Sequence, residues 1–182
     1  MSGYNGSDFF GPYNELTRAE TATVLGRLAG VNVAADNSCN NNGGFTTPFA
    51  DVDGVAWAAK AGVVTGYQDG SNTFGPDDSI TREQFALMPQ RYAEAAGLYE
   101  ASDGSALAAM PDASGVSDWA KDAVAWAVEQ GFIGKGGTVD AQGTITRGMP
   151  ATIVARFMDA CDLTTEVADT LADGEDGGDI VL

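Results

Sequence analysis

Three arginines recur in the same local setting, each directly after a threonine. They are Arg18, Arg82 and Arg147, and successive copies stand 64 and 65 residues apart. Threonine is a favoured helix N-cap, so each arginine is expected at the first residue of a helix. A cation at that position opposes the helix macrodipole, so helix stability does not explain it. An arginine beside the free N–H groups of a first helical turn is suited instead to binding an anion such as a carboxylate.

The elements that would position these arginines repeat along the chain. Nine residues after each of them stands a second arginine: Arg27, Arg91 and Arg156. A single arginine after a helix cap would be explained as a solvated side chain, but similarity at a fixed period over many offsets identifies an internal repeat. The apolar residues after each arginine have helical spacing. The sequence therefore predicts a mainly α fold with helices that begin within two residues of Arg18, Arg82 and Arg147.

The predicted helices differ in how they begin and continue. Two pairs match the capping-box template, Thr17 with Glu20 and Thr81 with Gln84. Arg147 is followed by Gly148 and Met149 and lacks such a partner, so we expect its first turn to be less rigid and to bind more weakly. Pro89 lies inside the second of these helices, which predicts a kink or a restart there. Ser117 or Asp118 is expected to cap a further helix over residues 119–130.

A longer pattern surrounds the second arginine. It consists of Phe49-Ala50-Asp51, Trp57-Ala58, Gly66-Tyr67-Gln68-Asp69-Gly70, Phe74-Gly75-Pro76 and Ile80-Thr81-Arg82. This pattern resembles the S-layer homology (SLH) repeat, and the resemblance extends from Gly3 to about Met158. The family implies a secreted, mainly α module in which three helix-loop-helix repeats take a pseudo-threefold arrangement. It also implies non-covalent anchoring at the bacterial cell surface, through a secondary cell-wall polysaccharide that is anionic and often carries pyruvate ketals on an amino sugar.

The resemblance divides the chain into six parts. They are the second half of repeat one (1–33), an Asn/Gly-rich loop (34–48), repeat two with a shortened first helix (49–98), a linker (99–109), repeat three (110–160) and an acidic tail (161–182). The first helix of repeat one would precede Gly3. We therefore expect the sequence to be cut from a longer chain, whose cargo domain lies outside it.

The resemblance also implies where a sugar binds, namely in grooves between adjacent repeats. Arginine supplies charge, tryptophan a flat apolar face for a sugar ring, and glycine a close backbone approach. The candidate ligand-binding residues are Arg18, Arg82, Arg147, Trp57, Trp119, Gly66, Gly70, Asp51 and Asp112. The groove expected to work is the one between repeats one and two, with Arg18 or Arg82 facing Trp57. Turn capping remains an alternative for the two aspartates, and core packing remains one for Trp119 and is favoured for Trp126.

The composition of the chain limits the kinds of partner it can bind. The net charge is −17, from nine basic and 26 acidic residues, and the chain has no histidine. Nucleic acid is excluded because its phosphates require a basic surface, and no apolar run has the length of a membrane span. Attraction to an anionic polymer must therefore be local, at a helix start with its own arginine.

Three other function classes are weighed against anchoring. A calcium site is not expected, because the EF-hand positions that need Asp and Glu hold Thr138 and Met149. An enzyme is not expected either, since the acid pair Asp51 and Asp53 has neither a nucleophile motif nor a histidine beside it. We predict no catalytic residue, no metal and no cofactor. The nearer alternative is a structural module for protein–protein assembly of a surface layer, without glycan binding.

Two cysteines, Cys39 and Cys161, lie far apart in the sequence and lack metal-ligand spacing. They are either independent thiols or, at an oxidising cell surface, partners in a disulfide.

Overall fold

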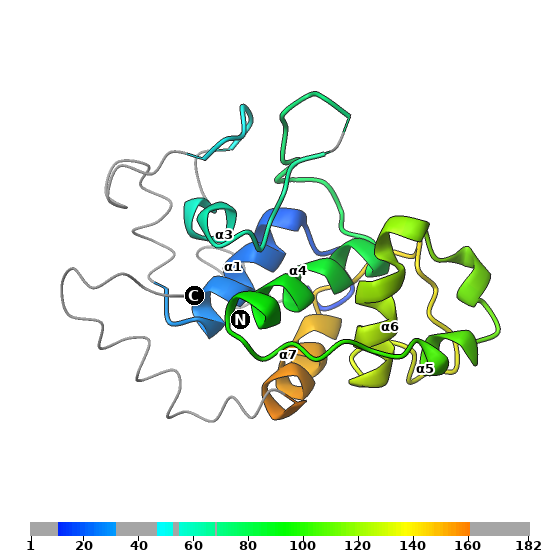
Figure 1. The fold of residues 1–182 in the computed structure, drawn as a ribbon. Coiled ribbons are helices and arrows are strands. Elements are labelled where there is room, and N and C mark those ends of the chain that lie inside the picture. The colour runs from blue at the N-terminus through cyan, green and yellow to red at the C-terminus, as the bar shows by residue number, and fades with distance from the viewer. Residues whose placement is uncertain (1–10, 32–46, 53–54, 68, 161–182) are drawn as a thin grey trace.

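The regular structure of this protein is helical, and long loops join the helices (Figure 1). The computed structural model describes residues 11–31, 47–52, 55–67 and 69–160. The helices are α1 (Arg18–Leu28), α3 (Ala56–Lys60), α4 (Arg82–Ala95), α5 (Ser105–Ala108), α6 (Lys121–Glu129) and α7 (Met149–Ala160), with 3-10 turns at Ala113–Gly115 and Asp118–Ala120. Within these described ranges, strand pairing is limited to isolated bridges. The predicted mainly α fold is confirmed.

The helices that carry the arginine motif begin where the sequence predicts. Capping boxes are present at Thr17 and at Thr81, and the helices α1 and α4 that follow begin at Arg18 and Arg82. Helix α7 begins at Met149, two residues after Arg147. The expectation that all three helices begin within two residues of an arginine is therefore confirmed.

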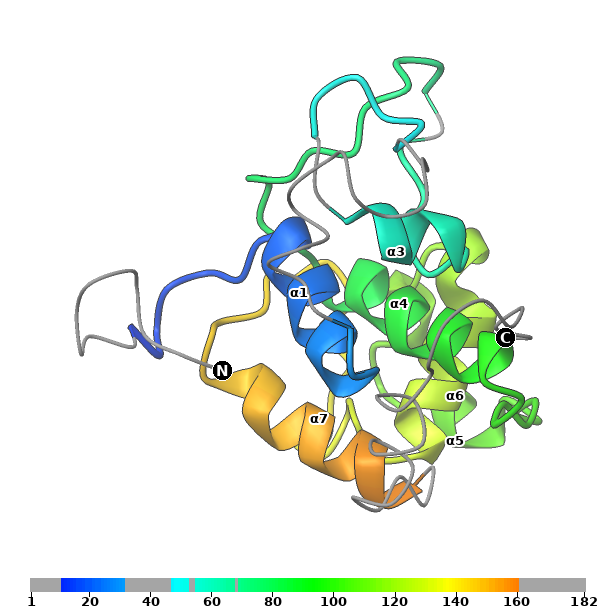
Figure 2. The same cartoon turned by 90° about the vertical axis from the view of Figure 1, so that its left-hand side faces the viewer.

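The residues just before these helices meet in a closed ring of backbone hydrogen bonds. Leu16 N–H donates to the Ile145 carbonyl at 2.7 Å, Ile145 N–H to the Ile80 carbonyl at 3.1 Å, and Ile80 N–H to the Leu16 carbonyl at 3.0 Å. All three side chains have no exposed surface. Helices α1, α4 and α7 leave this ring side by side, as Figure 2 shows. Because each segment donates to one neighbour and accepts from the other, every arginine is placed at a contact between two segments.

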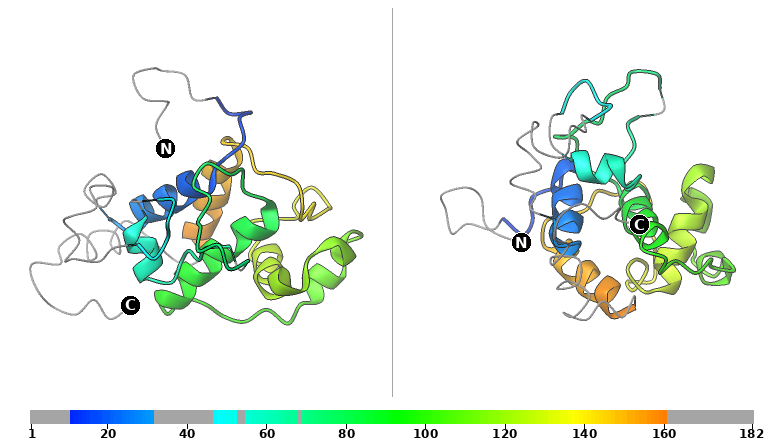
Figure 3. Two further views of the ribbon diagram at one scale, coloured as in Figure 1. Left: turned by 90° about the horizontal axis from the view of Figure 1, so that it is seen from above. Right: turned by 60° about the vertical axis from the view of Figure 1, so that its left-hand side comes forward.

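An aromatic cluster joins three of the helices on one side of the ring. The Trp126 ring of α6 lies with its centroid 5.1 Å from that of Phe132 and 6.3 Å from that of Phe157 in α7. Phe157 in turn meets Tyr92 of α4 at 5.7 Å. Trp126 is 2% exposed, so the expectation that it packs in the core is confirmed. These edge-to-face contacts bury large aromatic surface and fix α6 and α7 against α4. The backbone of these three helices can be followed in Figure 3.

Helix α4 does not restart at Pro89, so this part of the sequence prediction is wrong, while the kink stays a prediction. It continues from Arg82 to Ala95 with Pro89 inside it and buried. The proline lacks the N–H that would bond the Phe85 carbonyl, and an interior proline costs about 3 kcal/mol. Met88 and Tyr92 on either side of it are buried at 4% and 5% exposure. Burial of side chains of this size contributes about 1.5–3 kcal/mol each, which offsets the lost bond.

The start of the helix over residues 119–130 also differs from the prediction. A 3-10 turn occupies Asp118–Ala120 and α6 begins only at Lys121, with no side-chain cap at Ser117. The Ser117 hydroxyl donates instead to Glu83 Oε1 at 3.0 Å. The cap is therefore replaced by a tertiary contact with α4, which sequence spacing does not reveal.

Candidate functional site

Arg18 reaches from the start of α1 into the segment that precedes α4. Its Nε donates to the Phe74 carbonyl at 2.7 Å, and its Nη2 donates to the Thr65 carbonyl at 3.1 Å. The guanidinium carbon lies 4.6 Å from the ring centroid of Tyr67 and 4.9 Å from that of Phe74. Arg18 is 6% exposed, and burial lowers the pKa of its guanidinium. We call this meeting of α1 with residues 65–78 the Arg18 junction.

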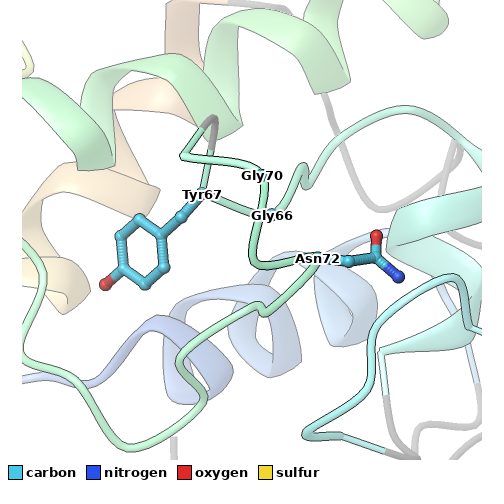
Figure 4. A pocket seen from close by; sticks show the side chains of 4 residues that line it. All are labelled: Gly66, Tyr67, Gly70 and Asn72. Carbon is cyan, nitrogen blue, oxygen red and sulfur yellow. The ribbon is translucent and has the colours of Figure 1, made fainter.

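A glycine-rich turn forms the outer wall of the Arg18 junction. Gly66, Tyr67, Gly70 and Asn72 line an open pocket there, and the side chains of Tyr67 and Asn72 leave the turn on opposite sides (Figure 4). A Cβ on Gly66 would lie 2.6 Å from the Thr73 carbonyl oxygen, so a side chain at this position would push the turn apart. The structure thus brings the candidates Arg18, Gly66 and Gly70 into one region.

Tyr67 controls the electrostatics of the same region. Its hydroxyl donates to Asp78 Oδ2 at 2.8 Å while its ring lies over Arg18. Burial, followed by the Asp78 hydrogen bond, raises the pKa of the Tyr67 phenol. Asp78 thus hydrogen-bonds the tyrosine, and the ion pairs found in the described part of the chain do not include Arg18.

A second arginine approaches the Arg18 junction from α4. Arg91 Nη1 donates to Thr65 Oγ1 at 3.1 Å, so Arg18 and Arg91 bind the carbonyl and the hydroxyl of the same threonine. Burial lowers the pKa of Arg91, and the charge of Arg91 also contributes to the lowered pKa of Arg18. Two cations thus converge on Thr65, on a chain whose net charge is −17.

Arg82 occupies a different position from the one expected for it. It reaches from the start of α4 to residues 112–149, and we call this meeting the Arg82 junction. Arg82 Nη1 forms an ion pair with Asp140 Oδ2 at 2.5 Å, and Nη2 lies 3.9 Å from the Met149 sulfur. Arg82 therefore lies beside the third set of motif residues and not beside the segment that holds Trp57.

Arg147 is paired as well. It forms an ion pair with Glu20 Oε1 and is 5% exposed. Glu20 Oε2 accepts the Thr17 N–H at 3.1 Å in the capping box of α1, so one carboxylate serves both functions. From its spacing in the sequence, Glu20 is expected only as a helix cap, and this pair is not predicted. We call the contact of Arg147 with residues 12–20 the Arg147 junction.

Asp51 and Asp112 hold equivalent loops in place. Asp51 accepts the N–H groups of Phe74 and Gly75, both at 2.7 Å. Asp112 accepts those of Val139 and Asp140, at 2.9 and 2.7 Å. These bonds, with Phe74 and Val139 first in effect, lower the pKa of each carboxyl. Because both oxygens of each carboxylate already accept a backbone N–H, the structure favours the turn-capping interpretation over a sugar contact.

The candidate tryptophans have unlike environments. Trp57 lies in α3 and is 9% exposed, within the hydrophobic core, so it presents little surface to a sugar ring. Trp119 is 56% exposed. Ser117, two residues before Trp119, hydrogen-bonds the Glu83 carboxylate. Glu83 is the residue after Arg82, so Trp119 lies close to the Arg82 junction in the chain. Of the two, Trp119 is the available stacking surface.

Sequence reasoning missed several polar groups that shape these junctions. Tyr67 and Arg91 were quoted only as parts of a motif or a repeat, and their convergence on Arg18 and Thr65 depends on tertiary structure. Glu83 is 3% exposed. From the sequence, a glutamate one residue after a helix start is expected on the surface. Cys39 and Cys161 fall outside the described residues, so the disulfide stays a prediction.

In the described part of the chain, no three His, Cys, Asp or Glu side chains lie close enough together to hold a metal ion. None of the helices found there has both the length and the apolar character needed to cross a bilayer.

The fold and the junctions define a class: a helical module in which arginines at repeated helix starts meet neighbouring segments. The model of the S-layer homology domain matches two parts of the chain, residues 46–86 and 109–148. These parts contain Arg82 and Arg147 with their preceding loops.

Several curated proteins are similar to this chain. The Cellulosome-anchoring protein of Acetivibrio thermocellus is 32% identical over 169 residues, which cover 87% of this chain and 35% of that protein. The S-layer protein sap of Bacillus anthracis is 28% identical over 84% of this chain and 18% of its own length. An Amylopullulanase of Thermoanaerobacterium thermosulfurigenes is 32% identical over 79% of this chain and only 8% of its own length. The chain thus spans about a third or less of the length of these relatives. In the Amylopullulanase, the similar segment is only a small part of that protein.

Proposed function

We propose that this chain is a non-catalytic anchoring module of the bacterial cell surface, which binds an anionic cell-wall polysaccharide and tethers a longer protein. Similarity to the Cellulosome-anchoring protein and to the S-layer protein sap supports the anchoring function. The match to the S-layer homology domain agrees with this function. The remaining question is which part of the molecule holds the polymer.

We propose three repeats about a pseudo-threefold axis, with the first repeat incomplete in this sequence. The closed ring through Leu16, Ile80 and Ile145 supports this arrangement. The backbone N–H groups of the three motif arginines extend this pattern, because each donates to the carbonyl two residues before the next member of the ring. The pairs are Arg18 with Asp78 at 3.0 Å, Arg82 with Gly143 at 3.0 Å and Arg147 with Asn14 at 2.8 Å. The family model covers two of these repeats, and the hydrogen bonds of residues 14–18 match those of the other two.

The Arg18 junction is the groove we assign to the ligand's carboxylate, and one observation carries this choice. Arg18 contacts carbonyls and aromatic rings, while Arg82 and Arg147 are ion-paired to carboxylates of the chain itself. The described residues offer Arg18 Nη1 no hydrogen-bond acceptor, so this nitrogen is the donor we assign to a ligand carboxylate such as a pyruvate ketal. Because Arg18 is 6% exposed, binding would displace the Tyr67 ring from the guanidinium.

The sugar ring itself would rest on the glycine-rich turn. Gly66 and Gly70 permit close backbone approach, and the open pocket along Asn72 leaves room beside them. Arg91, held on Thr65 Oγ1, adds a second positive charge. Local attraction of this kind acts within about 8–10 Å at physiological salt, so it is effective despite the net charge of −17.

The test is binding to purified cell walls before and after mild acid removes the secondary polymer. The chain is expected to sediment with intact walls and to remain in solution with stripped walls. Equal binding to both wall preparations would contradict a polymer ligand. Self-association without any wall binding would favour the alternative, a structural assembly module.

A further inference from the structure

Asp140 lies where a ligand's carboxylate would sit on Arg82. Its Oδ2 contacts Arg82 Nη1 at 2.5 Å. The backbone of Asp140 cannot easily move away, because its N–H donates to Asp112 Oδ2 at 2.7 Å and its carbonyl accepts the Gly143 N–H at 3.0 Å. Asp140 also has a positive φ of 50°, an uncommon conformation for a residue with a side chain. A fixed backbone in a strained conformation thus presents a carboxylate to the motif arginine.

The Arg18 junction shows the same backbone with the side chains exchanged. Gly75 occupies the position of Asp140, with a φ of 67° and with its N–H on Asp51 Oδ2 at 2.7 Å. Three residues later the exchange is reversed, since Asp78 stands where the Arg82 junction has Gly143. A Cβ on Gly75 would overlap the Asp78 carboxylate, and a Cβ on Gly143 would overlap the Asp140 carboxylate. Each junction therefore has room for one carboxylate at this place.

The two carboxylates have different partners. Asp78 accepts the Tyr67 hydroxyl at 2.8 Å, and the ring of the same tyrosine lies over Arg18. The corresponding loop of the Arg82 junction, residues 131–139, contains no tyrosine to hold Asp140 in this way. Asp140 therefore pairs with the arginine directly, while Asp78 does not.

Resting on the proposed carboxylate-binding function, we propose that Asp140 is an internal substitute for the ligand's carboxylate at Arg82. It makes the Arg82 junction a poor anion site and directs the ligand to the Arg18 junction. A ligand carboxylate that approaches Arg82 must displace Asp140 from its ion pair and then meet its negative charge nearby, since the backbone of Asp140 stays anchored. Asp140 is thus the residue that determines which groove accepts an anion.

The experiment is calorimetric titration with a monosaccharide probe, the methyl glycoside of an N-acetyl amino sugar that carries a pyruvate ketal. Wild-type protein is compared with Asp140→Asn, which removes the charge and keeps a residue that tolerates positive φ. Asp140→Gly copies Gly75 and serves if the asparagine variant folds poorly. Asp122→Asn is the matched control, because it removes one negative charge from an exposed position on α6 without a contact to Arg82.

Wild type is expected to bind one equivalent of the probe, and Asp140→Asn a second equivalent with at least tenfold higher affinity than wild type shows at that site. The double variant Asp140→Asn with Arg82→Ala should bind one equivalent again. If Asp140→Asn and Asp140→Gly bind as Asp122→Asn does, or if wild type already binds two equivalents tightly, the inference is overturned while the proposed function stands. If wild type binds no probe at all, the proposed function fails and the inference fails with it.

Discussion

The Arg18 junction and the Arg82 junction share their backbone hydrogen bonds and differ in the side chains that cover them. Ala19 N–H donates to the Pro76 carbonyl at 3.1 Å, and Glu83 N–H donates to the Ala141 carbonyl at 3.0 Å, at equivalent positions. Beyond the backbone, the first junction is closed by an arginine under aromatic rings. The second is closed by carboxylates. The same chain path therefore supports one junction packed around aromatic rings and one held by an ion pair.

Glu83 accounts for much of the rigidity at the Arg82 junction. Its Oε1 accepts the Ser117 hydroxyl at 3.0 Å and Gln142 Nε2 at 2.8 Å, while Oε2 accepts the Ser117 N–H at 3.0 Å. The residue at its place in the Arg18 junction is Ala19, which has no polar side chain. Glu83 is the buried member of this network, Ser117 is half-buried and Gln142 is exposed. Such a network fixes a packing arrangement only while its buried members are satisfied.

The largest expected effect comes from removing this network. Glu83→Ala leaves the Ser117 and Gln142 donors without their acceptor, and it should lower the free energy of unfolding by about 3 kcal/mol. Urea denaturation followed by circular dichroism measures the change. Glu129→Ala, at an exposed glutamate of α6, is the control and should stay within about 0.5 kcal/mol of wild type. Equal stability of the two variants would mean that the Arg82 junction does not depend on its buried carboxylate.

The Arg18 junction should be most sensitive at Gly66. Gly66→Ala places a Cβ against the Thr73 carbonyl, which already accepts the Tyr67 N–H at 2.9 Å. The turn must open, so we expect a loss of about 1–3 kcal/mol in stability and weaker wall binding. Gly136→Ala, where a Cβ would meet nothing within 4 Å, is the matched control. Thermal denaturation compares the two, and a harmless Gly66→Ala would contradict the close packing of this turn.

A smaller effect is expected from Arg18→Lys, which keeps the charge. Lysine cannot donate to both the Phe74 and the Thr65 carbonyls while it offers a further N–H to a ligand. Probe affinity should fall about tenfold, which corresponds to 1.4 kcal/mol. Arg82→Lys should cost less, because Arg82 is already occupied by Asp140. Calorimetry on both variants tests the comparison, and a greater loss for Arg82→Lys would reverse the assignment of the groove.

The sequence predicted the parts of this structure that depend on local spacing. Helix starts at Arg18 and Arg82 follow from threonine caps, and the core position of Trp126 follows from its place in mid-helix. It did not predict which arginine meets which loop, because those contacts join residues 47 to 127 positions apart. Nor did it predict that Glu20 serves a second helix start as well as its own.

The tryptophans teach the same lesson about burial. Trp57 and Trp119 were equal candidates by motif, yet Trp57 is 9% exposed and Trp119 56%. The shortened α3, only Ala56–Lys60, packs against α1 and brings its tryptophan into the core. Spacing on a helix face shows that residues lie together, but whether that face is covered depends on the neighbouring helix.

The smallest expected effect is on the stability of variants at Asp51 and Asp112, and here the two junctions should behave alike. Asp51 and Asp112 accept equivalent pairs of backbone N–H groups, and these bonds lower the pKa of both carboxyls. A lowered folded-state pKa stabilises the protein above the unfolded value of about 3.9, and this contribution disappears as the pH falls through the folded-state pKa. Asp51→Asn and Asp112→Asn should therefore each be less stable than wild type at pH 7, and the difference should shrink as the pH falls through the folded-state pKa of the carboxyl. Urea midpoints measured across this range provide the test. If only one variant shows the pH-dependent loss, the two loops are not held in the same way, and the junctions differ in their backbone support as well as in their side chains.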